Sequence, residues 1–181
     1  EEYMPYRVVT MDGCEADDII GVICKNYNTD PILIVSSDKD FIQLQKYKNI
    51  SQWSPLTKKF LNNPKPEEQL RALIVKGDRS DGVPNILSND NCLVEGLRQK
   101  PLSKKKIEKW LSGNPEELFE GELLRNYKRN ETLIDLACIP DSIQINIQTR
   151  YESDQYTGRD KMLNYFIKYR LKELTESIQE F

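Results

Sequence analysis

Residues 31–40 read PILIVSSDKD, and this stretch decides the fold that we expect for the chain. The apolar run over residues 31–35 is rich in β-branched side chains, which is typical of a strand covered on both faces. Upstream, residues 6–10 read as a short strand, and apolar side chains at helical spacing predict a helix over residues 15–27. Strand, helix and strand in this order form a βαβ unit. We therefore expect a parallel sheet whose ligand crevice lies at the carboxyl ends of its strands.

A change of pattern divides the chain at residues 62–66, which read NNPKP and are typical of a turn-rich boundary. Before this boundary, residues 50–53 predict a third strand. The sequence thus predicts an α/β fold in two parts, a parallel-sheet part over residues 1–66 and an all-α part over residues 67–181. Within the second part we place helices near residues 67–76, 103–111, 115–135, 141–151 and 159–181.

The composition excludes several classes of protein. None of the 181 residues is histidine, which removes Ser-His-Asp hydrolases, Cys-His proteases and the common zinc sites. The four cysteines form no CxxC pair, so a zinc ribbon and a thioredoxin-like motif are excluded too. No apolar run approaches the roughly 18 to 20 residues that a bilayer requires, and no signal peptide opens the chain. We expect a protein of a reducing, cytoplasmic compartment (the host cytoplasm if a phage encodes it) with no membrane partner.

The net charge of −3 hides an uneven distribution. Residues 1–45 hold nine acids and three bases, whereas residues 98–109 hold six bases and one acid. The basic stretch contains Lys104, Lys105 and Lys106, which are candidate contacts to a nucleic-acid backbone, and Ser103 would cap their helix. A solvated helix face is the alternative interpretation of these lysines.

Two groups of carboxylates stand where the expected elements bring them together. Glu15, Asp17 and Asp18 open the expected helix, and Asp38 and Asp40 follow the strand directly. Each group also has a structural interpretation, since acids favour a first helical turn and Asp38 would cap a strand-to-helix turn. Together they place five acids at one crevice, where a bound cation relieves the repulsion between like charges. Ligation by oxygen alone selects hard ions, so we predict Mg²⁺ or Mn²⁺, and two such ions about 3.5 to 4 Å apart would clamp a phosphodiester.

A third acidic group lies in KGDRSDG, residues 76–82, where a glycine ends an expected helix. An ordinary helix-ending loop is one interpretation. The other is that Asp78 and Asp81 reach the metal crevice while the rest of the loop holds a nucleic-acid backbone. The candidate contacts to that backbone are Lys76, Gly77, Arg79, Ser80 and Gly82.

The acidic motifs EADD (residues 15–18), SDKDFIQL (residues 37–44) and KGDRSD (residues 76–81) resemble those of the flap endonuclease and 5′-nuclease family in order and spacing. The stretches at residues 127–141 and 165–168 are similar to the T-even phage ribonuclease H branch in particular. The similarity extends over nearly the whole chain. The motifs are specific as a set, although each piece alone is not.

The resemblance implies a nuclease that removes 5′ RNA primers and 5′ flaps from DNA with two divalent ions. Its fold would be a PIN-like α/β part with an appended helical part, in which the helix, loop and helix over residues 67–110 grip duplex backbone. Asp17 and Asp38 would be catalytic, as inner ligands of the first ion. The partners would be 5′-flap DNA or an RNA–DNA hybrid and a single-stranded DNA-binding protein, with the enzyme a monomer. The second ion and its water shell would belong to Glu15, Asp18, Asp40, Asp78 and Asp81.

Two departures from the family pattern bear on activity. Family members begin with a strand that bears a metal-binding Asp, a further Asp and a helical arch, and none of these precedes Glu1 here. We therefore expect the C-terminal portion of a nuclease, inactive alone. The loop after Pro84 lacks the closely spaced glycines of the family, with Gly96 the next glycine, which argues against a monovalent-cation site there.

Two other functions stay open. A non-catalytic DNA-binding or replication-partner module would keep the acids as relics, and the sequence upstream of Glu1 would distinguish it. A Mg²⁺-dependent phosphotransfer or receiver-like α/β domain also clusters acids at strand ends. The basic helical part of the chain is not explained by that last alternative.

Overall fold

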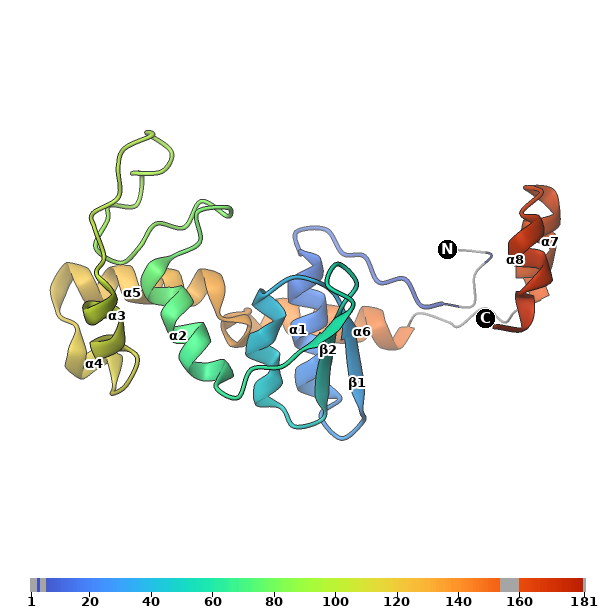
Figure 1. Cartoon of the computed structure of the whole chain (residues 1–181), viewed down its shortest axis with the longest axis horizontal. Coiled ribbons are helices and arrows are strands. Elements are labelled where there is room, and N and C mark those ends of the chain that lie inside the picture. Colours follow the sequence, from blue (N-terminus) through green and yellow to red (C-terminus); the bar gives the residue numbers. More distant parts are fainter. Residues whose placement is uncertain (1–2, 4–5, 154–159, 181) are drawn as a thin grey trace.

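A small mixed sheet forms the centre of the N-terminal part (Figure 1). The structure is a computed structural model that describes residue 3, residues 6–153 and residues 160–180. Strands β1 (Ile32–Val35), β2 (Ile50–Ser54) and β3 (Lys59–Leu61) lie in the order β1-β2-β3. β1 and β2 are parallel, whereas β3 folds back antiparallel to β2. The parallel pairing of the strands predicted at residues 31–35 and 50–53 is thus confirmed, and β3 was not predicted.

The predicted strand over residues 6–10 was wrong. These residues form no strand, and the exposed fractions of Tyr6 and Val8 are 54% and 37%. Among the described residues β1 pairs with β2 alone, so no neighbouring strand offers its backbone groups to residues 6–10. The crossover between the parallel strands is instead the 3-10 helix η1 (Asp40–Lys46).

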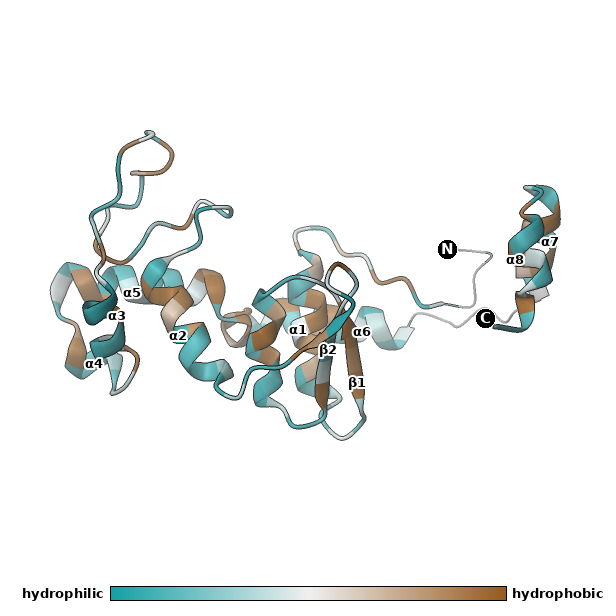
Figure 2. Cartoon of the chain, in the orientation of Figure 1, coloured by the Kyte–Doolittle hydropathy of each residue, from teal (hydrophilic) through white to brown (hydrophobic). Residues whose placement is uncertain are grey.

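Among the described residues, only one face of the sheet is covered. Ile34 and Ile50 point from the strands into a core with Cys24 of helix α1 (Ala16–Asn26) and with Phe41 and Leu44 of η1. On the other face of β1, two apolar side chains are more than half exposed, and β1 stands out as a hydrophobic strand in Figure 2. The expectation of coverage on both faces therefore fails in the described part of the chain. The exposed side chains are Leu33 and Val35.

The rest of the chain is helical, and the described residues after β3 contain no strand. The predicted helices near residues 67–76, 103–111 and 141–151 are confirmed. One of them, α2, packs against η1 and against α5, which ties the helical part to the sheet part. The elements in order are α2 (Pro66–Lys76), α3 (Lys104–Trp110), α4 (Pro115–Leu118), α5 (Gly121–Ile134), η2 (Leu136–Cys138), α6 (Asp141–Ser153), α7 (Asp160–Lys168), α8 (Lys172–Glu176) and η3 (Ile178–Glu180).

Two predicted helices are broken. Residues 115–135 form α4 and α5, because Phe119 between them takes an extended backbone and buries its ring. That ring lies 5.3 Å from Trp110 and 5.1 Å from Tyr127, centroid to centroid, so aromatic packing offsets the interruption of the helix. Within the helix predicted at residues 159–181, the chain turns at Arg170, where φ is 57°. Residues 159 and 181 themselves lie outside the described part.

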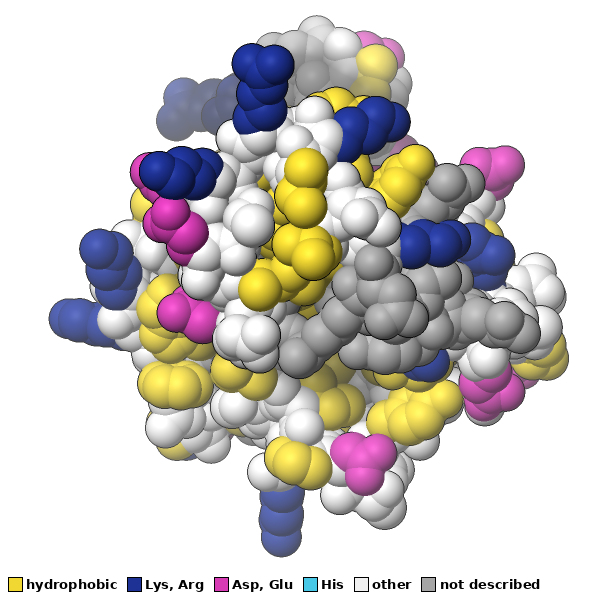
Figure 3. Space-filling view, turned by 90° about the vertical axis from the view of Figure 1, so that its right-hand side faces the viewer, with side chains coloured by type: hydrophobic (Ala, Val, Ile, Leu, Met, Phe, Trp, Pro, Cys, Tyr) yellow, Lys and Arg dark blue, Asp and Glu magenta, His cyan; other side chains and the backbone are white. Residues whose placement is uncertain are grey.

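Helices α7 and α8 form a separate end of the molecule (Figure 1). Met162 and Phe166 of α7 are buried, whereas Leu163 and Ile167 are 42% and 60% exposed. Hydrophobic side chains accordingly gather on this end in the space-filling view of Figure 3. None of the helices in the described residues is long and apolar enough to cross a membrane.

A tight loop after α2 carries two of the predicted acids. Gly77 ends α2 with a φ of 69°, and a Cβ at this position would lie 2.6 Å from the carbonyl carbon of Pro84. Only glycine permits so close an approach, and the resulting loop is closed by a hydrogen bond from Val83 N–H to the Asp78 carbonyl (2.6 Å). We call residues 77–84 the acid loop. Its fold returns the chain across the end of α2 and places Asp78 and Asp81 beside α1 and η1.

Candidate metal centre

Three chain segments bring all seven predicted carboxylates around two adjoining pockets. The segments are the start of α1, the turn from β1 into η1, and the acid loop. The smaller pocket has a volume of about 80 Å³ and the wider one a volume of about 410 Å³. Asp18 lines only the smaller pocket and Asp38 only the wider one. Both pockets are lined by Glu15, Asp17, Asp40, Asp78 and Asp81.

The start of α1 orients its acids by a capping box. The Asp18 carboxylate accepts a hydrogen bond from Glu15 N–H (3.0 Å), which satisfies a free donor at the helix start. The structural interpretation of this group therefore holds for Asp18. Burial, followed by the charge of Asp38 and then of Glu15, raises the pKa of Asp17 above its usual range. Asp17 thus interacts electrostatically with an acid of another segment.

The turn after β1 places Asp38 and Asp40 side by side. Asp38 Oδ1 accepts a hydrogen bond from Asp40 N–H (3.0 Å), so Asp38 shapes the turn into η1. The N-cap position belongs to Lys39, however, and not to Asp38 as its structural interpretation proposed. One oxygen of a carboxylate serves this turn while the other is left for a further interaction. Asp40 is the first residue of η1 and lines both pockets.

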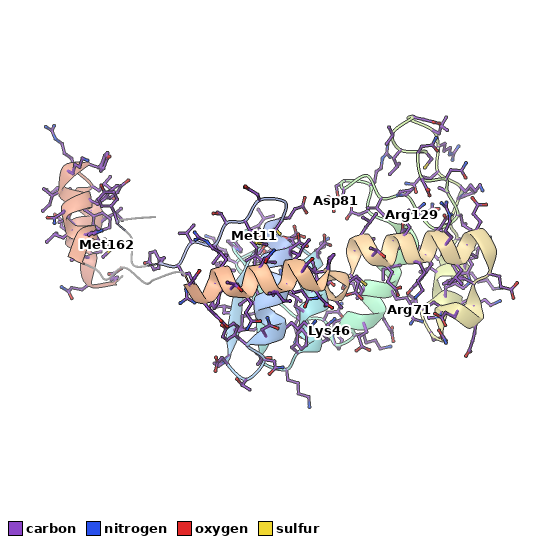
Figure 4. The ribbon with its side chains drawn as sticks, turned by 180° about the vertical axis from the view of Figure 1, so that it is seen from behind. Met11, Lys46, Arg71, Asp81, Arg129 and Met162 are labelled. Atoms are coloured by element: carbon purple, nitrogen blue, oxygen red, sulfur yellow. The ribbon has the colours of Figure 1, made fainter. Side chains whose placement is uncertain are left out.

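The two carboxylates of the acid loop differ in the direction in which their pKa is changed. Asp78 Oδ1 accepts hydrogen bonds from Ser80 N–H (2.8 Å) and from the Ser80 hydroxyl, and these bonds lower the pKa of Asp78. Burial, then Asp78 and Asp38, raise the pKa of Asp81. Figure 4 shows Asp81 on its loop, on the same side of α5 as Arg129.

Two triads of carboxylates can each hold a metal ion. The oxygens of Asp17, Asp38 and Asp40 lie within 4.8 Å of one another, and so do those of Asp40, Asp78 and Asp81. Burial raises the pKa of the shared Asp40 to about 6, with Asp38, Asp78, Asp81 and Asp17 adding to the effect in that order. A set of carboxylates alone is the donor chemistry of a hard divalent cation. The site therefore fits metal ions, and the two triads share one ligand.

The candidate nucleic-acid contacts fall in two places. Arg79, Ser80 and Gly82 of the acid loop line a third pocket of about 270 Å³, whose other wall includes Leu97. Lys76 ends α2 as an exposed side chain directly before Gly77. The lysines at the first three positions of α3 are also exposed, and α3 lies toward the end of the helical part away from α1 (Figure 1). These lysines are Lys104, Lys105 and Lys106.

Sequence reasoning missed the buried amides beside the acids. Gln43 lines the smaller pocket, and its side chain joins η1 to the end of α5. Gln52 is fully buried behind the turn that carries Asp38. A glutamine is usually exposed, and no spacing rule distinguishes one that bonds to a distant backbone carbonyl.

Comparison with known proteins shows the family to which the chain belongs. Residues 2–73 match the family model described as "5'-3' exonuclease, N-terminal resolvase-like domain", and residues 65–181 match "T4 RNase H, C terminal". The second match covers more than half of the chain, so the chain belongs to the T4 RNase H family. This finding confirms the resemblance read from the acidic motifs, and it confirms an α/β part followed by a helical part.

The relatives that this chain matches are longer than the chain itself. It is 40% identical over 190 aligned residues to Ribonuclease H of Enterobacteria phage T4. The alignment covers 99% of this chain and 62% of that protein. It is 35% identical over 94 residues to a 5′-3′ exonuclease of Buchnera aphidicola subsp. Schizaphis graminum, covering 47% and 33%. A crystal structure of the T5 D15 protein co-crystallized with metal ions matches 78% of this chain and 60% of its own, with a TM-score of 0.49 and 20% identity.

The raised pKa of Asp40 predicts how the stability of the metal-free protein depends on pH. A carboxyl whose pKa rises from 3.8 to about 6 on folding binds its proton more tightly in the folded state, so stability falls as pH rises from about 4 to about 6. Asp40→Asn removes this penalty. Its Tm should therefore exceed that of the wild type at pH 7, and the difference should shrink toward pH 4.

Scanning calorimetry with a chelator present measures this difference. Asp30→Asn is the matched control, because Asp30 is exposed and lines neither acidic pocket. It should track the wild type at every pH. A difference between Asp40→Asn and wild type that stays constant over this pH range would contradict the assignment.

Proposed function

We propose that the chain supplies the metal centre and the DNA-binding helical part of a two-metal-ion 5′ nuclease. The observation that carries the proposal is the pair of carboxylate triads sharing Asp40, found on a chain of a 5′-3′ exonuclease family. The reaction would be hydrolysis of phosphodiester bonds from the 5′ end, in 5′-flap DNA or in RNA paired with DNA. Two relatives carry the names ribonuclease H and 5′-3′ exonuclease, which supports this substrate class.

The carboxylates would divide between two ions, Mg²⁺ or Mn²⁺. Asp17 and Asp38 would be the inner ligands of the first, and Asp40 lies within reach of both. Divalent ions held here would stabilise the charge that develops on the attacking and leaving oxygens of the phosphodiester. The second ion and its water shell would be held by Glu15, Asp18, Asp40, Asp78 and Asp81.

The chain's own contribution is to hold these acids close together and to place a duplex beside them. The segment from α2 through α3 would grip the backbone, with the acid loop at its inner end and the lysines of α3 at its outer end. Cationic side chains and free N–H groups bind phosphates without reading sequence. A single-stranded DNA-binding protein is the further partner that we propose, and the nuclease would act as a monomer.

Activity tests the proposal most directly on two forms of the chain. One form is the chain itself, and the other is the chain fused to the part of T4 ribonuclease H that lies outside the match. We expect the fused form to cut 5′-labelled flap DNA and RNA–DNA hybrids only with Mg²⁺ or Mn²⁺ present, and the unfused chain to cut poorly. Asp38→Asn in the fused form should lower the rate roughly 100-fold or more, because a neutral amide holds a divalent ion poorly.

Asp30→Asn in the same fusion should cut at the wild-type rate. A fused wild type that folds but never cuts would favour the non-catalytic DNA-binding module instead. An Asp38→Asn variant as fast as the wild type would contradict the assigned centre.

Salt dependence tests the lysines of α3. Three consecutive helical residues fan over about 200°, so only one or two of them can reach one strand of DNA. Replacing Lys104, Lys105 and Lys106 with Ala should flatten the slope of log affinity against log salt by roughly 1 to 2 units, about 0.9 for each lost phosphate contact. Affinity should fall equally for unrelated sequences. Titration of flap DNA at several salt concentrations provides the slope.

A second triple variant controls for the change in net charge. Lys48, Lys59 and Lys168 are exposed elsewhere on the chain, and their replacement with Ala should alter the slope less. Equal slopes for the two triple variants would indicate that these α3 lysines form a solvated helix face and do not contact DNA.

A further inference from the structure

Each acid-bearing segment outside α1 is joined to another part of the chain by a buried side-chain amide. Three such amides, Gln43, Gln52 and Asn130, are 4%, 0% and 0% exposed. They lie on η1, β2 and α5, far apart in the sequence. Within the described residues, their hydrogen bonds to other segments all involve backbone groups and none involves a carboxylate.

Gln52 holds the turn that carries Asp38. Its Nε2 donates to the carbonyls of Ser36 (2.9 Å) and Asp38 (2.5 Å), so one amide clamps both sides of the turn after β1. Its Oε1 is buried and has no hydrogen-bond partner among the described residues. A buried acceptor without a partner destabilises a fold. The two hydrogen bonds that its nitrogen donates offset this cost.

Gln43 holds the segment that begins with Asp40. Its Nε2 donates to the carbonyl of Ile134 (3.1 Å), and its Oε1 accepts from Leu136 N–H (2.9 Å). A 3-10 helix has three residues per turn, so residues 40 and 43 lie on one face of η1, and both line the smaller pocket. The link from η1 to the end of α5 therefore sets where the shared ligand Asp40 stands.

Asn130 closes the acid loop. Its Nδ2 donates to the carbonyl of Ile74 (2.7 Å) in the last turn of α2 and to the carbonyl of Pro84 (2.8 Å) at the far end of the loop. Its Oδ1 accepts from Arg129 Nε, and Arg129 Nη2 donates to the same Pro84 carbonyl (3.1 Å). One side chain thus fixes both ends of the loop that bears Asp78 and Asp81.

These three side chains are uncharged, and their lack of charge matters as much as the segments that they join. At Gln43, which lines the smaller pocket, a lysine or arginine would neutralise the acids and compete with a cation, whereas a carboxylate would add to their repulsion. The cationic Arg129 bonds at the far end of the acid loop and lines neither acidic pocket. A neutral amide donates two N–H groups to backbone carbonyls and adds no charge of its own. The negative charge of the carboxylates is then available to bind a cation. Buried amides are therefore suited to hold the acids together without altering their charge.

We propose that Gln43, Gln52 and Asn130 are positioning residues that set the spacing of the acid-bearing segments and thereby the affinity for divalent cations. The proposal rests on the metal centre proposed above and deepens it. Groups that orient metal ligands from outside typically change metal affinity 10- to 100-fold when they are removed.

The chain offers matched controls for two of these residues. Gln45, also on η1, donates to the Leu61 carbonyl and accepts from Asn63 N–H, the same bonding pattern as Gln43 but away from the acids. Asn126, one turn before Asn130 on α5, donates to the carbonyls of Ile86 and Ser88 and accepts from Arg125. Asn126 is also buried. Each control variant should lose the same kind of hydrogen bonds without displacing one of the acidic side chains.

The experiment compares Gln43→Met with Gln45→Met and Asn130→Leu with Asn126→Leu, together with Gln52→Met. For each protein, calorimetric titration with Mn²⁺ gives the affinity, and a thermal melt with a chelator gives the metal-free Tm. We expect the three test variants to bind Mn²⁺ roughly 10- to 100-fold more weakly than the wild type. The two controls should lose comparable Tm and keep the wild-type affinity.

Where a test variant does not fold, Gln43→Asn and Gln52→Asn replace it, since each withdraws the amide by one methylene and should weaken Mn²⁺ binding too. Equal losses of affinity in test and control variants, or none in either, would overturn the positioning role. A wild type that binds no Mn²⁺ would instead overturn the metal centre on which the proposal rests. The two failures are therefore distinguishable.

Discussion

Repulsion among seven carboxylates is the constraint on which the rest of this structure depends. Oxygens of different segments lie within 4.8 Å of one another. Two unit charges at that separation repel by about 1 to 4 kcal/mol, depending on how far water screens them. Burial raises the pKa of Asp17, Asp40 and Asp81, and the neighbouring carboxylates raise it further. A fold that gathers such charges must hold them by other means until a cation arrives.

Local hydrogen bonds orient some of the acids, and long-range bonds hold the segments that carry them. Asp18 is fixed by the capping box of α1, Asp78 by its hydrogen bonds from Ser80, and Asp38 by the bond from Asp40 N–H. The places of the turn that carries Asp38 and Asp40, and of the acid loop, depend on contacts with β2, α2 and α5. The arrangement joins the sheet part to the helical part at the place where the acids meet. A change far from the acids, in β2 or α5, is thus able to reach the metal centre.

The sequence predicted the acids better than it predicted their supports. Carboxylates directly after an apolar strand and at a helix start are visible as patterns, and the structure brings them around adjoining pockets. On β2 the alternation ISQWS buries Gln52 and leaves Trp53 partly exposed, the reverse of what hydrophobicity favours. The two carbonyls that Gln52 holds decide this, and they belong to residues distant in the chain. Likewise a ring contact with Trp110 and Tyr127, invisible in local propensity, breaks the predicted helix at Phe119.

The most direct test of the account counts the ions that the chain binds. Titration with Mn²⁺ at pH 7, followed by the paramagnetic resonance of the free ion, gives stoichiometry and affinity in one experiment. The account predicts two Mn²⁺ per chain at millimolar concentration, with a rise in Tm from ligand binding to the folded state. Because Asp40 belongs to both triads, Asp40→Asn should weaken both ions together. Absence of Mn²⁺ binding at millimolar concentration, or an Asp40→Asn variant with unchanged stoichiometry and affinity, would contradict it.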